Sequence, residues 1–282
     1  MGRLTKNPIG VMQGRLLPKY KGRYQAHPVG YWQDEFRIAE ELGLDCIEFI
    51  LDYNDAEINP ILTPEGRKEI LSLTSQTGVR VLSVCADYFM EAPLHAKDTG
   101  LAKQSFEILS QLITAAGELE IKDIVIPCVD HSSVQDEVKR QRFQEQLSET
   151  IPKAEEKGVN LALETDLNPS LFRALLENFR SDRVTVNYDT GNSAALGYDA
   201  EEELKAYGGR VSDIHIKDRK FSGGPVIFGA GDWNYDLFFK ELKKIGFKGH
   251  FIMQAYRDDE GLEVFKKQLD WLKEKIIYLY GN

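Results

Sequence analysis

The chain alternates between short runs of apolar, β-branched residues and longer stretches in which apolar and charged residues recur with a helical period. The apolar runs predict strands at Ile9–Arg15, Cys46–Leu51, Val79–Asp87, Asp123–Asp130, Asn160–Asp166, Val184–Asp189, Val211–Lys217 and His250–Tyr256. The stretches between them predict helices near residues 33–43, 63–77, 97–118, 135–157, 168–180, 199–207, 234–245 and 260–280. Glycines mark several expected helix ends, at Gly43, Gly78, Gly117, Gly158 and Gly246.

This alternation of strand and helix predicts a parallel sheet, and a set of eight β/α units matches the closure of a barrel. An open doubly wound sheet is the alternative, and it predicts a glycine-rich turn after the first strand. The segment Val11–Leu16 holds a single glycine, so the barrel is favoured. The predicted fold class is therefore α/β, with residues 1–282 forming a single (β/α)₈ TIM barrel domain.

Composition and charge bear on the cellular location of the protein, the state of its cysteines and the class of its partners. No run approaches the roughly 18 apolar residues of a membrane helix, and Met1–Gly10 has no apolar segment typical of a signal peptide, which predicts a cytoplasmic location. The three cysteines are widely spaced and fit buried thiols. The net charge of −10, from 35 basic and 45 acidic residues, argues against nucleic acid as a partner.

Three long loops follow predicted strands, at Leu16–Trp32, Asp87–Ala96 and Asp218–Trp233. Loops after strands lie on the catalytic face of a (β/α)₈ barrel, where substrates bind. Long ordered loops in a compact domain are usually functional. The sequence therefore places its longest connections on the face where a site is expected.

Four successive predicted strands carry a residue that can bind a metal near their C-terminal ends, namely Glu164, Asp189, His215 and Gln254. Their spacings of 25, 26 and 39 residues correspond to one β/α unit each, so the side chains can converge. Taken singly, each also fits a helix cap or a core histidine. Together they predict a mixed oxygen and nitrogen site for one divalent ion, Mn²⁺, Zn²⁺, Co²⁺ or Mg²⁺.

The segments Leu-Glu-Thr-Asp, Tyr-Asp-Thr-Gly-Asn and Ile-His-Ile-Lys-Asp resemble the signature strands of the xylose isomerase-like TIM barrel superfamily. That superfamily includes sugar phosphate isomerases and epimerases, inosose dehydratases and endonuclease IV. The resemblance follows the strand order of the whole barrel and is strongest from Asn160 to Tyr256. It implies that Glu164, Asp189 and His215 bind metal, and that Glu164 also moves the substrate proton.

The sequence departs from this pattern at Gln254, where related ketose 3-epimerases have a second catalytic glutamate that also binds metal. An amide oxygen can coordinate a metal but cannot act as a base at neutral pH. We therefore predict catalytic roles for Glu164, Gln254 and Lys217. Either the chemistry needs one base, as in aldose–ketose isomerisation, or a second proton carrier replaces the missing glutamate, with Lys217, Asp87, Asp130 and His131 as candidates.

Further polar residues follow the predicted strands, and loop capping or surface solvation explains any single one of them. The predicted substrate-binding residues are Arg15, Asp87, Asp130, His131, Asn192, Arg219 and Arg257. Glu48 and Asp52, near the second strand, are weaker candidates for hydrogen bonds to sugar hydroxyls. Several cations on one face, including Lys217 and Lys220, favour a phosphorylated or acidic substrate.

These features predict a metal-dependent isomerase or epimerase of a small sugar or sugar phosphate, which abstracts a proton α to a carbonyl through a metal-stabilised enediolate. The alternatives are an inosose or keto-sugar dehydratase of the same superfamily and a non-catalytic sugar-binding barrel. A DNA repair endonuclease is disfavoured by the acidic chain and its five histidines. The expected partner is the sugar, without nucleic acid or membrane, and a homo-oligomer is possible.

Overall fold

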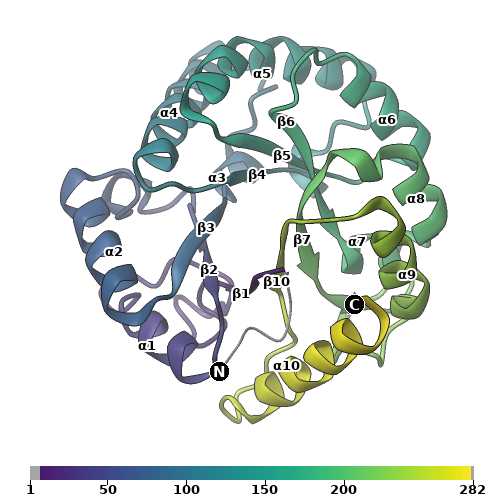
Figure 1. Cartoon of the computed structure of the whole chain (residues 1–282). Coiled ribbons are helices and arrows are strands. Elements are labelled where there is room, and N and C mark those ends of the chain that lie inside the picture. Colours follow the sequence, from purple (N-terminus) through teal and green to yellow (C-terminus); the bar gives the residue numbers. More distant parts are fainter. Residues whose placement is uncertain (1–6, 281–282) are drawn as a thin grey trace.

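The computed structural model describes residues 7–280. Most of Met1–Gly10, the segment on which the expected absence of a signal peptide rests, lies outside the described residues. Parallel strands form a closed barrel in the order β1-β10-β7-β6-β5-β4-β3-β2 (Figure 1). The strands are β1 (Ile9–Met12), β2 (Cys46–Ile50), β3 (Arg80–Cys85), β4 (Asp123–Cys128), β5 (Asn160–Thr165), β6 (Val184–Asp189), β7 (Val211–Ile216) and β10 (His250–Met253). The predicted (β/α)₈ barrel is confirmed, and the open sheet is excluded because β1 pairs with β10.

One long helix covers the outside of the barrel in each β/α unit (Figure 1). These are α1 (Asp34–Glu41), α2 (Pro64–Thr77), α4 (Thr99–Glu118), α5 (Glu137–Lys157), α6 (Pro169–Glu177), α8 (Ala200–Tyr207), α9 (Tyr235–Ile245) and α10 (Glu263–Lys275). Six of them start with a short polar side chain that accepts a backbone N–H of the first turn, and these capping residues are Thr63, Asp98, Asp136, Asn168, Asp199 and Asn234. The chain therefore starts its helices where the sequence offers a cap.

Gly117 does not end a helix as predicted, because α4 continues to Glu118. A Cβ at position 117 would lie 3.0 Å from the Cβ of Lys157, so this glycine lets α4 approach α5 closely. By contrast, Gly78, Gly158 and Gly246 do cap their helices in the left-handed conformation.

Several short elements near the strand ends are absent from the sequence prediction. They are η1 (Ala56–Ile58), α3 (Tyr88–Glu91), η2 (Asp130–Ser132), α7 (Thr190–Leu196), η3 (Gly208–Arg210), and the hairpin of β8 (Asp218–Arg219) and β9 (Pro225–Val226). The terminal turn η4 (Ile276–Tyr280) falls within the helix predicted near residues 260–280. The predicted strand Ile9–Arg15 is also too long, because Gly14 turns the chain with a φ of +86°. The two insertions that bear on the site are α7 and the hairpin, which follow β6 and β7.

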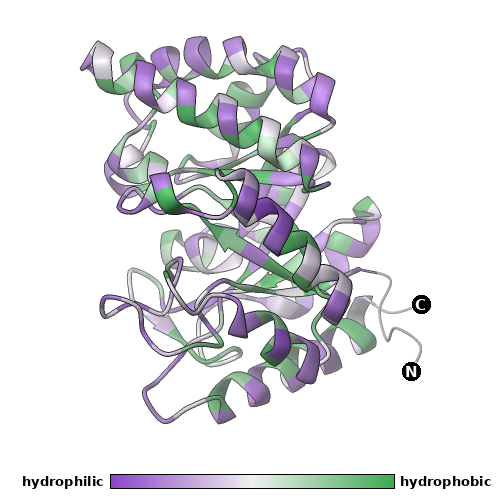
Figure 2. Cartoon of the chain, turned by 90° about the vertical axis from the view of Figure 1, so that its left-hand side faces the viewer, coloured by the Kyte–Doolittle hydropathy of each residue, from purple (hydrophilic) through white to green (hydrophobic). Residues whose placement is uncertain are grey.

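Strand residues alternate between two environments. Side chains that point outward pack under the helices in the main apolar core, and Figure 2 shows the strands as a hydrophobic layer inside more hydrophilic helices. A smaller apolar cluster fills part of the barrel interior, formed by Met12, Cys46, Ile50, Leu82, Cys85, Val125, Ala162 and Ile252. The inward side chains of β6 and β7 are instead polar, which leaves the site on that side. Within residues 7–280, no helix is both long enough and apolar enough to cross a membrane.

Candidate metal centre and substrate site

Glu164, Asp189 and His215 converge at the C-terminal ends of β5, β6 and β7, as the strand spacing predicts. One ligand atom from each lies within 4.8 Å of the others. The Nδ1 atom of His215 is 3.6 Å from Oε2 of Glu164 and 3.8 Å from Oδ2 of Asp189. Gln254 follows β10 and places its amide nitrogen 3.0 Å from the same Nδ1 atom. The four predicted metal ligands therefore form one cluster.

The Asp-Thr-Gly-Asn segment builds this cluster and starts α7. Asp189 caps the helix, with Oδ1 accepting the backbone N–H groups of Gly191 and Asn192 at 2.8 Å each. That use of Oδ1 leaves Oδ2 facing His215. Thr190 donates its hydroxyl hydrogen to the backbone oxygen of Lys217 at 2.7 Å. A Cβ on Gly191 would lie only 2.6 Å from Cγ of Lys217, so glycine is required for this approach.

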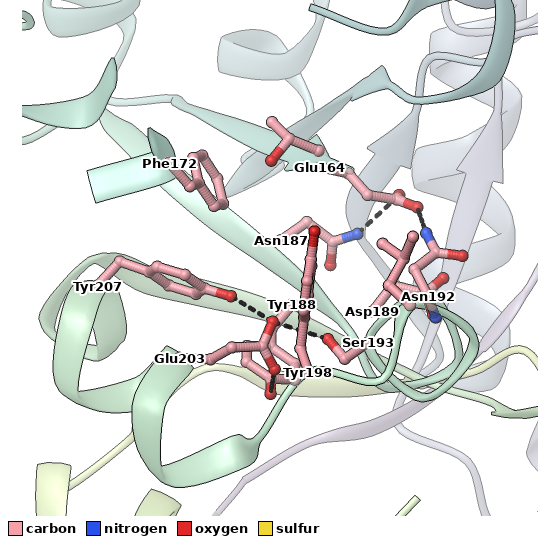
Figure 3. A pocket seen from close by; sticks show the side chains of 12 residues that line it. Glu164, Phe172, Asn187, Tyr188, Asp189, Asn192, Ser193, Tyr198, Glu203 and Tyr207 are labelled. Atoms are coloured by element: carbon pink, nitrogen blue, oxygen red, sulfur yellow. Dashed lines mark hydrogen bonds between the residues drawn. The ribbon is translucent and has the colours of Figure 1, made fainter. Parts of the chain in front are cut away.

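Two amides hold the carboxylate of Glu164. Asn187 donates to Oε2 at 3.0 Å, and Asn192 donates to Oε1 at 2.7 Å (Figure 3). Asn187 precedes Asp189 by two residues on β6, so both side chains point into the barrel. Arg219 reaches the other end of the Asn192 amide, with Nη1 3.4 Å from Oδ1. These contacts fix the orientation of a carboxylate that is only 7% exposed.

A pocket beside Glu164 separates the cluster from α8 (Figure 3). On its far side, the buried carboxylate of Glu203 accepts hydrogen bonds from Tyr207 at 2.7 Å and Ser193 at 2.9 Å. Tyr188 also donates to Glu203. Because Ser193 belongs to α7, this contact anchors the helix whose first turn carries Asn192.

The donor set fits a divalent ion. Within residues 7–280, Oδ2 of Asp189 and Oε1 of Gln254 are buried oxygens without a hydrogen-bond partner, which is costly for a polar atom unless a cation or a water satisfies it. Two carboxylates, an imidazole and an amide oxygen are common ligands of Zn²⁺, Mn²⁺, Co²⁺ and Mg²⁺. Glu164, Asp189, His215 and Gln254 could therefore hold such an ion.

The electrostatics of the cluster agree with this fit. Burial raises the pKa of Glu164 above its usual value, and the neighbouring carboxylate of Asp189 raises it further. Burial opposes a charge on His215, but Glu48, Asp189 and Glu164 outweigh it and raise the pKa of the imidazole. Burial also opposes the charge of Asp189, but Lys217 and His215 outweigh it and lower its pKa. The raised pKa of His215 thus reflects the negative field of the surrounding carboxylates, which favours a cation in the cluster.

A second group of possible ligands lies deeper in the barrel. It consists of Glu48, Asp213 and His215, and the first two are completely inaccessible to solvent. His215 takes part in both groups through opposite ring nitrogens, because its Nε2 atom lies 2.7 Å from Oε1 of Glu48. The upper group retains some exposure, 7% for Glu164 and 5% for Asp189, so it is the one that a substrate can approach.

Lys217 lies at the edge of the upper cluster, half-buried, with Nζ 3.9 Å from Oδ2 of Asp189. Asp87 is also half-buried and faces the barrel mouth, where it accepts hydrogen bonds from Cys85 at 3.1 Å and Gln25 at 3.3 Å. Burial raises the pKa of Asp87. Asp87 also interacts electrostatically with Glu164 and His215, so both Lys217 and Asp87 lie near the cluster.

Asp130 and His131 do not join the cluster. The strand β4 ends at Cys128, two residues earlier than predicted, and the chain turns outward through η2 with a φ of +49° at Asp130. Both side chains are exposed, and no hydrogen bond or ion pair within residues 7–280 connects them to the cluster. Their predicted roles in binding the substrate receive no support from this placement.

Arg15 and Arg257 form a pair of cations at the mouth. Arg15 donates to the backbone oxygen of Ala255 at 3.0 Å, and Arg257 donates to the backbone oxygen of Arg15. The Nε atoms of both are buried without a hydrogen-bond partner, and neither guanidinium forms an ion pair with a carboxylate in the described part of the chain. Burial, followed by repulsion from Arg257, lowers the pKa of Arg15 to about 10.

Contacts around this pair join the loop after β1 to the loop after β10. Tyr24 donates to the backbone oxygen of Asp258 at 2.6 Å, and its ring lies 4.5 Å beneath the guanidinium of Arg257. Lys19 forms an ion pair with Asp259 at 2.7 Å. The two arginines are thus held in place by contacts on both loops.

Comparison with known proteins agrees with this architecture. Residues 36–275 match the family described as xylose isomerase-like TIM barrel. The chain belongs to this family. It is 30% identical over 267 residues to the L-ribulose-5-phosphate 3-epimerase UlaE of Salmonella paratyphi A, covering 89% of this chain and 93% of that protein.

Two solved structures resemble the fold along nearly the whole chain. The xylose isomerase domain protein from Planctomyces limnophilus has a TM-score of 0.76 and 15% identity, with 98% of each chain covered. A xylose isomerase-like TIM barrel protein from Mycobacterium smegmatis, in complex with magnesium, has a TM-score of 0.72 and 19% identity, again with 98% of each chain covered.

Within this xylose isomerase-like barrel, sequence reasoning missed Asn187 and Asp213 and gave Glu48 a different place. Asn187 and Asp213 each precede a predicted ligand by two residues, so the strand period was the available signal. Glu48 points inward beneath His215 and away from the mouth where sugar hydroxyls would lie. Asp52 is engaged by Arg23 at 2.9 Å and by the backbone N–H of His27.

Proposed function

We propose that the protein is a metal-dependent isomerase or epimerase of a small sugar or sugar phosphate. The cluster of Glu164, Asp189 and His215 at the open end of the barrel carries this proposal. Glu164, Asp189, His215 and Gln254 would hold one divalent ion. When bound, the ion supplies Lewis acidity, polarising a carbonyl and an adjacent hydroxyl of the substrate.

Glu164 is the proposed base. Its carboxylate is oriented by Asn187 and Asn192 and is poised to take a proton from the carbon next to the carbonyl. Its raised pKa brings it closer to neutral pH, where a base both accepts and returns a proton efficiently.

Gln254 bears on whether the proposed reaction is an isomerisation or an epimerisation. Returning the proton to the neighbouring carbon on the same face, while the hydroxyl proton passes to the former carbonyl oxygen, isomerises the sugar with Glu164 as the only base that acts on carbon. Inverting a carbon requires a second proton carrier on the other face, which Gln254 cannot provide. Asp87 and Lys217 are the candidates placed near the cluster. The name of the UlaE relative favours epimerisation, whereas Gln254 favours the one-base route.

Arg15 and Arg257 support a substrate with an anionic end. Two guanidiniums without a carboxylate partner repel each other, and a phosphate dianion would neutralise both while accepting their free N–H groups. The arginines also belong to the loops that border the mouth. We extend the proposal to a single domain over residues 1–282 with a cytoplasmic location, and the oligomeric state stays a prediction.

The test is proton exchange measured by NMR. The protein is incubated in deuterated water with Mn²⁺, Zn²⁺, Co²⁺ or Mg²⁺ and a panel of ketoses, aldoses and their phosphates, with Mn²⁺ reactions quenched and freed of metal before measurement. We expect metal-dependent deuterium incorporation next to the carbonyl and a new sugar, abolished in Glu164→Gln and unchanged in the surface control Glu149→Gln. Full turnover by Glu164→Gln would refute the proposed base, and loss of water from the substrate would identify a dehydratase instead.

A further inference from the structure

Glu48 is an acidic residue inside the barrel that the proposed reaction does not use. It lies on β2, across the barrel from the ligand cluster, and is completely inaccessible to solvent. Ser83 donates its hydroxyl hydrogen to Oε2 of Glu48 at 2.5 Å. The other oxygen, Oε1, lies 2.7 Å from Nε2 of His215. The carboxylate therefore meets the imidazole from below and cannot reach a substrate at the mouth.

This contact determines what each nitrogen of His215 can do. A carboxylate accepts hydrogen bonds, so the contact to Oε1 requires the proton on Nε2. In the neutral ring that binds a metal, Nδ1 then carries the lone pair, and it is the nitrogen that faces Glu164 and Asp189, at 3.6 and 3.8 Å. The amide nitrogens of Asn187 and Gln254, which can only donate, lie 3.0 Å from Nδ1, in agreement with a lone pair there.

We propose that Glu48 is a positioning residue for the metal centre. It holds the proton on Nε2 and the plane of the ring, so that Nδ1 of His215 is presented as a ligand. A carboxylate behind a ligating histidine makes the ring a better donor and fixes its orientation. This inference rests on the proposed metal site, but it concerns how that site is assembled rather than which reaction it performs.

A purely structural role for Glu48 predicts a different effect when the residue is replaced. A buried carboxylate that only stabilises the barrel would, when replaced, lower stability without a specific effect on the metal. Glu35 offers a matched comparison, because it is equally buried and its carboxylate accepts backbone N–H groups of Gly14 and Leu16 away from the cluster. Glu35→Gln therefore reports the effect of losing a buried glutamate that has no contact with a ligand.

The experiment measures Zn²⁺ binding by competition with a chelator in the full-length wild type, Glu48→Leu, Glu48→Gln and Glu35→Gln, with unfolding curves for each. We expect Glu48→Leu to bind Zn²⁺ about 10- to 100-fold more weakly. Glu48→Gln, which keeps an oxygen for the Nε2 proton, should lose less affinity. Glu35→Gln should keep the affinity of the wild type although it loses stability.

A second measurement does not depend on whether Glu48→Leu folds. In zinc-loaded wild-type protein labelled with ¹⁵N, we expect the spectrum of His215 to show Nδ1 bound to the metal and a proton on Nε2. Zinc bound through Nε2, or unchanged affinity in folded Glu48→Leu, would overturn the role of Glu48 and leave the metal site standing. Failure of the wild type to bind any divalent ion would instead overturn the proposed function itself.

Discussion

The side-chain amide of Asn192 donates a hydrogen bond to Oε1 of Glu164 over 2.7 Å and so ties the first turn of α7 to the end of β5. The proposed base is thus oriented by the element that follows the next strand. The Asp-Thr-Gly-Asn segment supplies a helix cap, a tie to β7, a close approach to Lys217 and this hydrogen bond in four consecutive residues.

Replacing Asn192 by alanine should slow turnover with little effect on folding. A hydrogen bond to a charged group contributes about 1.5–3 kcal/mol, so kcat should fall roughly 10- to 100-fold in Asn192→Ala. Steady-state kinetics on the substrate found by proton exchange would measure this. Asn178→Ala is the control, because Asn178 is an exposed asparagine outside the cluster whose side-chain amide donates to Gln144. Equal rates in both variants would contradict the role of Asn192.

Gln254 should limit both metal affinity and the range of products. In Gln254→Glu a negative ligand replaces a neutral one, so we expect divalent ions to bind at least about tenfold more tightly. The new carboxylate would also provide a second proton carrier, which should raise epimerised product relative to isomerised product. Metal titration and NMR of the product mixture measure the two effects. An unchanged metal affinity would show that residue 254 does not contact the ion.

The arginine pair should distinguish phosphorylated from free sugars. Replacing Arg257 by glutamine removes one of two cations, so the KM for a sugar phosphate should rise about tenfold or more. The KM for the corresponding free sugar should stay near its original value. Arg37→Gln, on the exposed face of α1, is the matched control. A similar increase for both sugars would assign Arg257 to the structure of the mouth rather than to phosphate.

His250 should make stability depend on pH. Burial opposes its charge, but Asp213, 3.2 Å away, and Asp123 raise its pKa from 6.5 to about 9. Because the folded protein binds this proton more tightly than the unfolded chain, the stabilisation is complete below pH 6.5 and is lost as the pH rises through 9. The free energy of unfolding should therefore fall by about 3 kcal/mol over this range.

Urea unfolding of the wild type and of His250→Gln between pH 6 and pH 9.5 checks this expectation. The variant should be less stable than the wild type at pH 6 and should lose less stability as the pH rises. Parallel curves for the two proteins would mean that another group controls the decline.

The barrel was predictable because its signals are long and repeated. Each strand is an apolar run, each long helix has a periodic face, and glycine or a polar cap marks many of the ends. The short helix Tyr88–Glu91 has too few residues to show a helical period. The helix Thr190–Leu196 starts directly at a strand end, where Asp189 is both a predicted ligand and the helix cap, so its segment was interpreted as a ligand motif and not as the start of a helix.

The ligand cluster was predictable because equal spacing along the chain becomes proximity in a closed parallel barrel. Residues that precede the cluster in the sequence were harder to place in the fold. Glu48 shares its face of β2 with Cys46 and Ile50, while Ile47 and Phe49 make the other face equally apolar, so the pattern does not tell which face is inward. Asp130 was misplaced because one apolar run continues past the residue at which β4 ends.

Arg15 and Arg257 also lie in the loops that begin after the first and the last strands of the barrel, whose pairing closes the sheet. An anion bound by both arginines would link two segments that lie 242 residues apart in the chain. Unfolding has to open this closure, so a bound sugar phosphate should raise the melting temperature in step with the logarithm of its concentration. The thermal stability of the protein would then depend on how much of its own substrate is present.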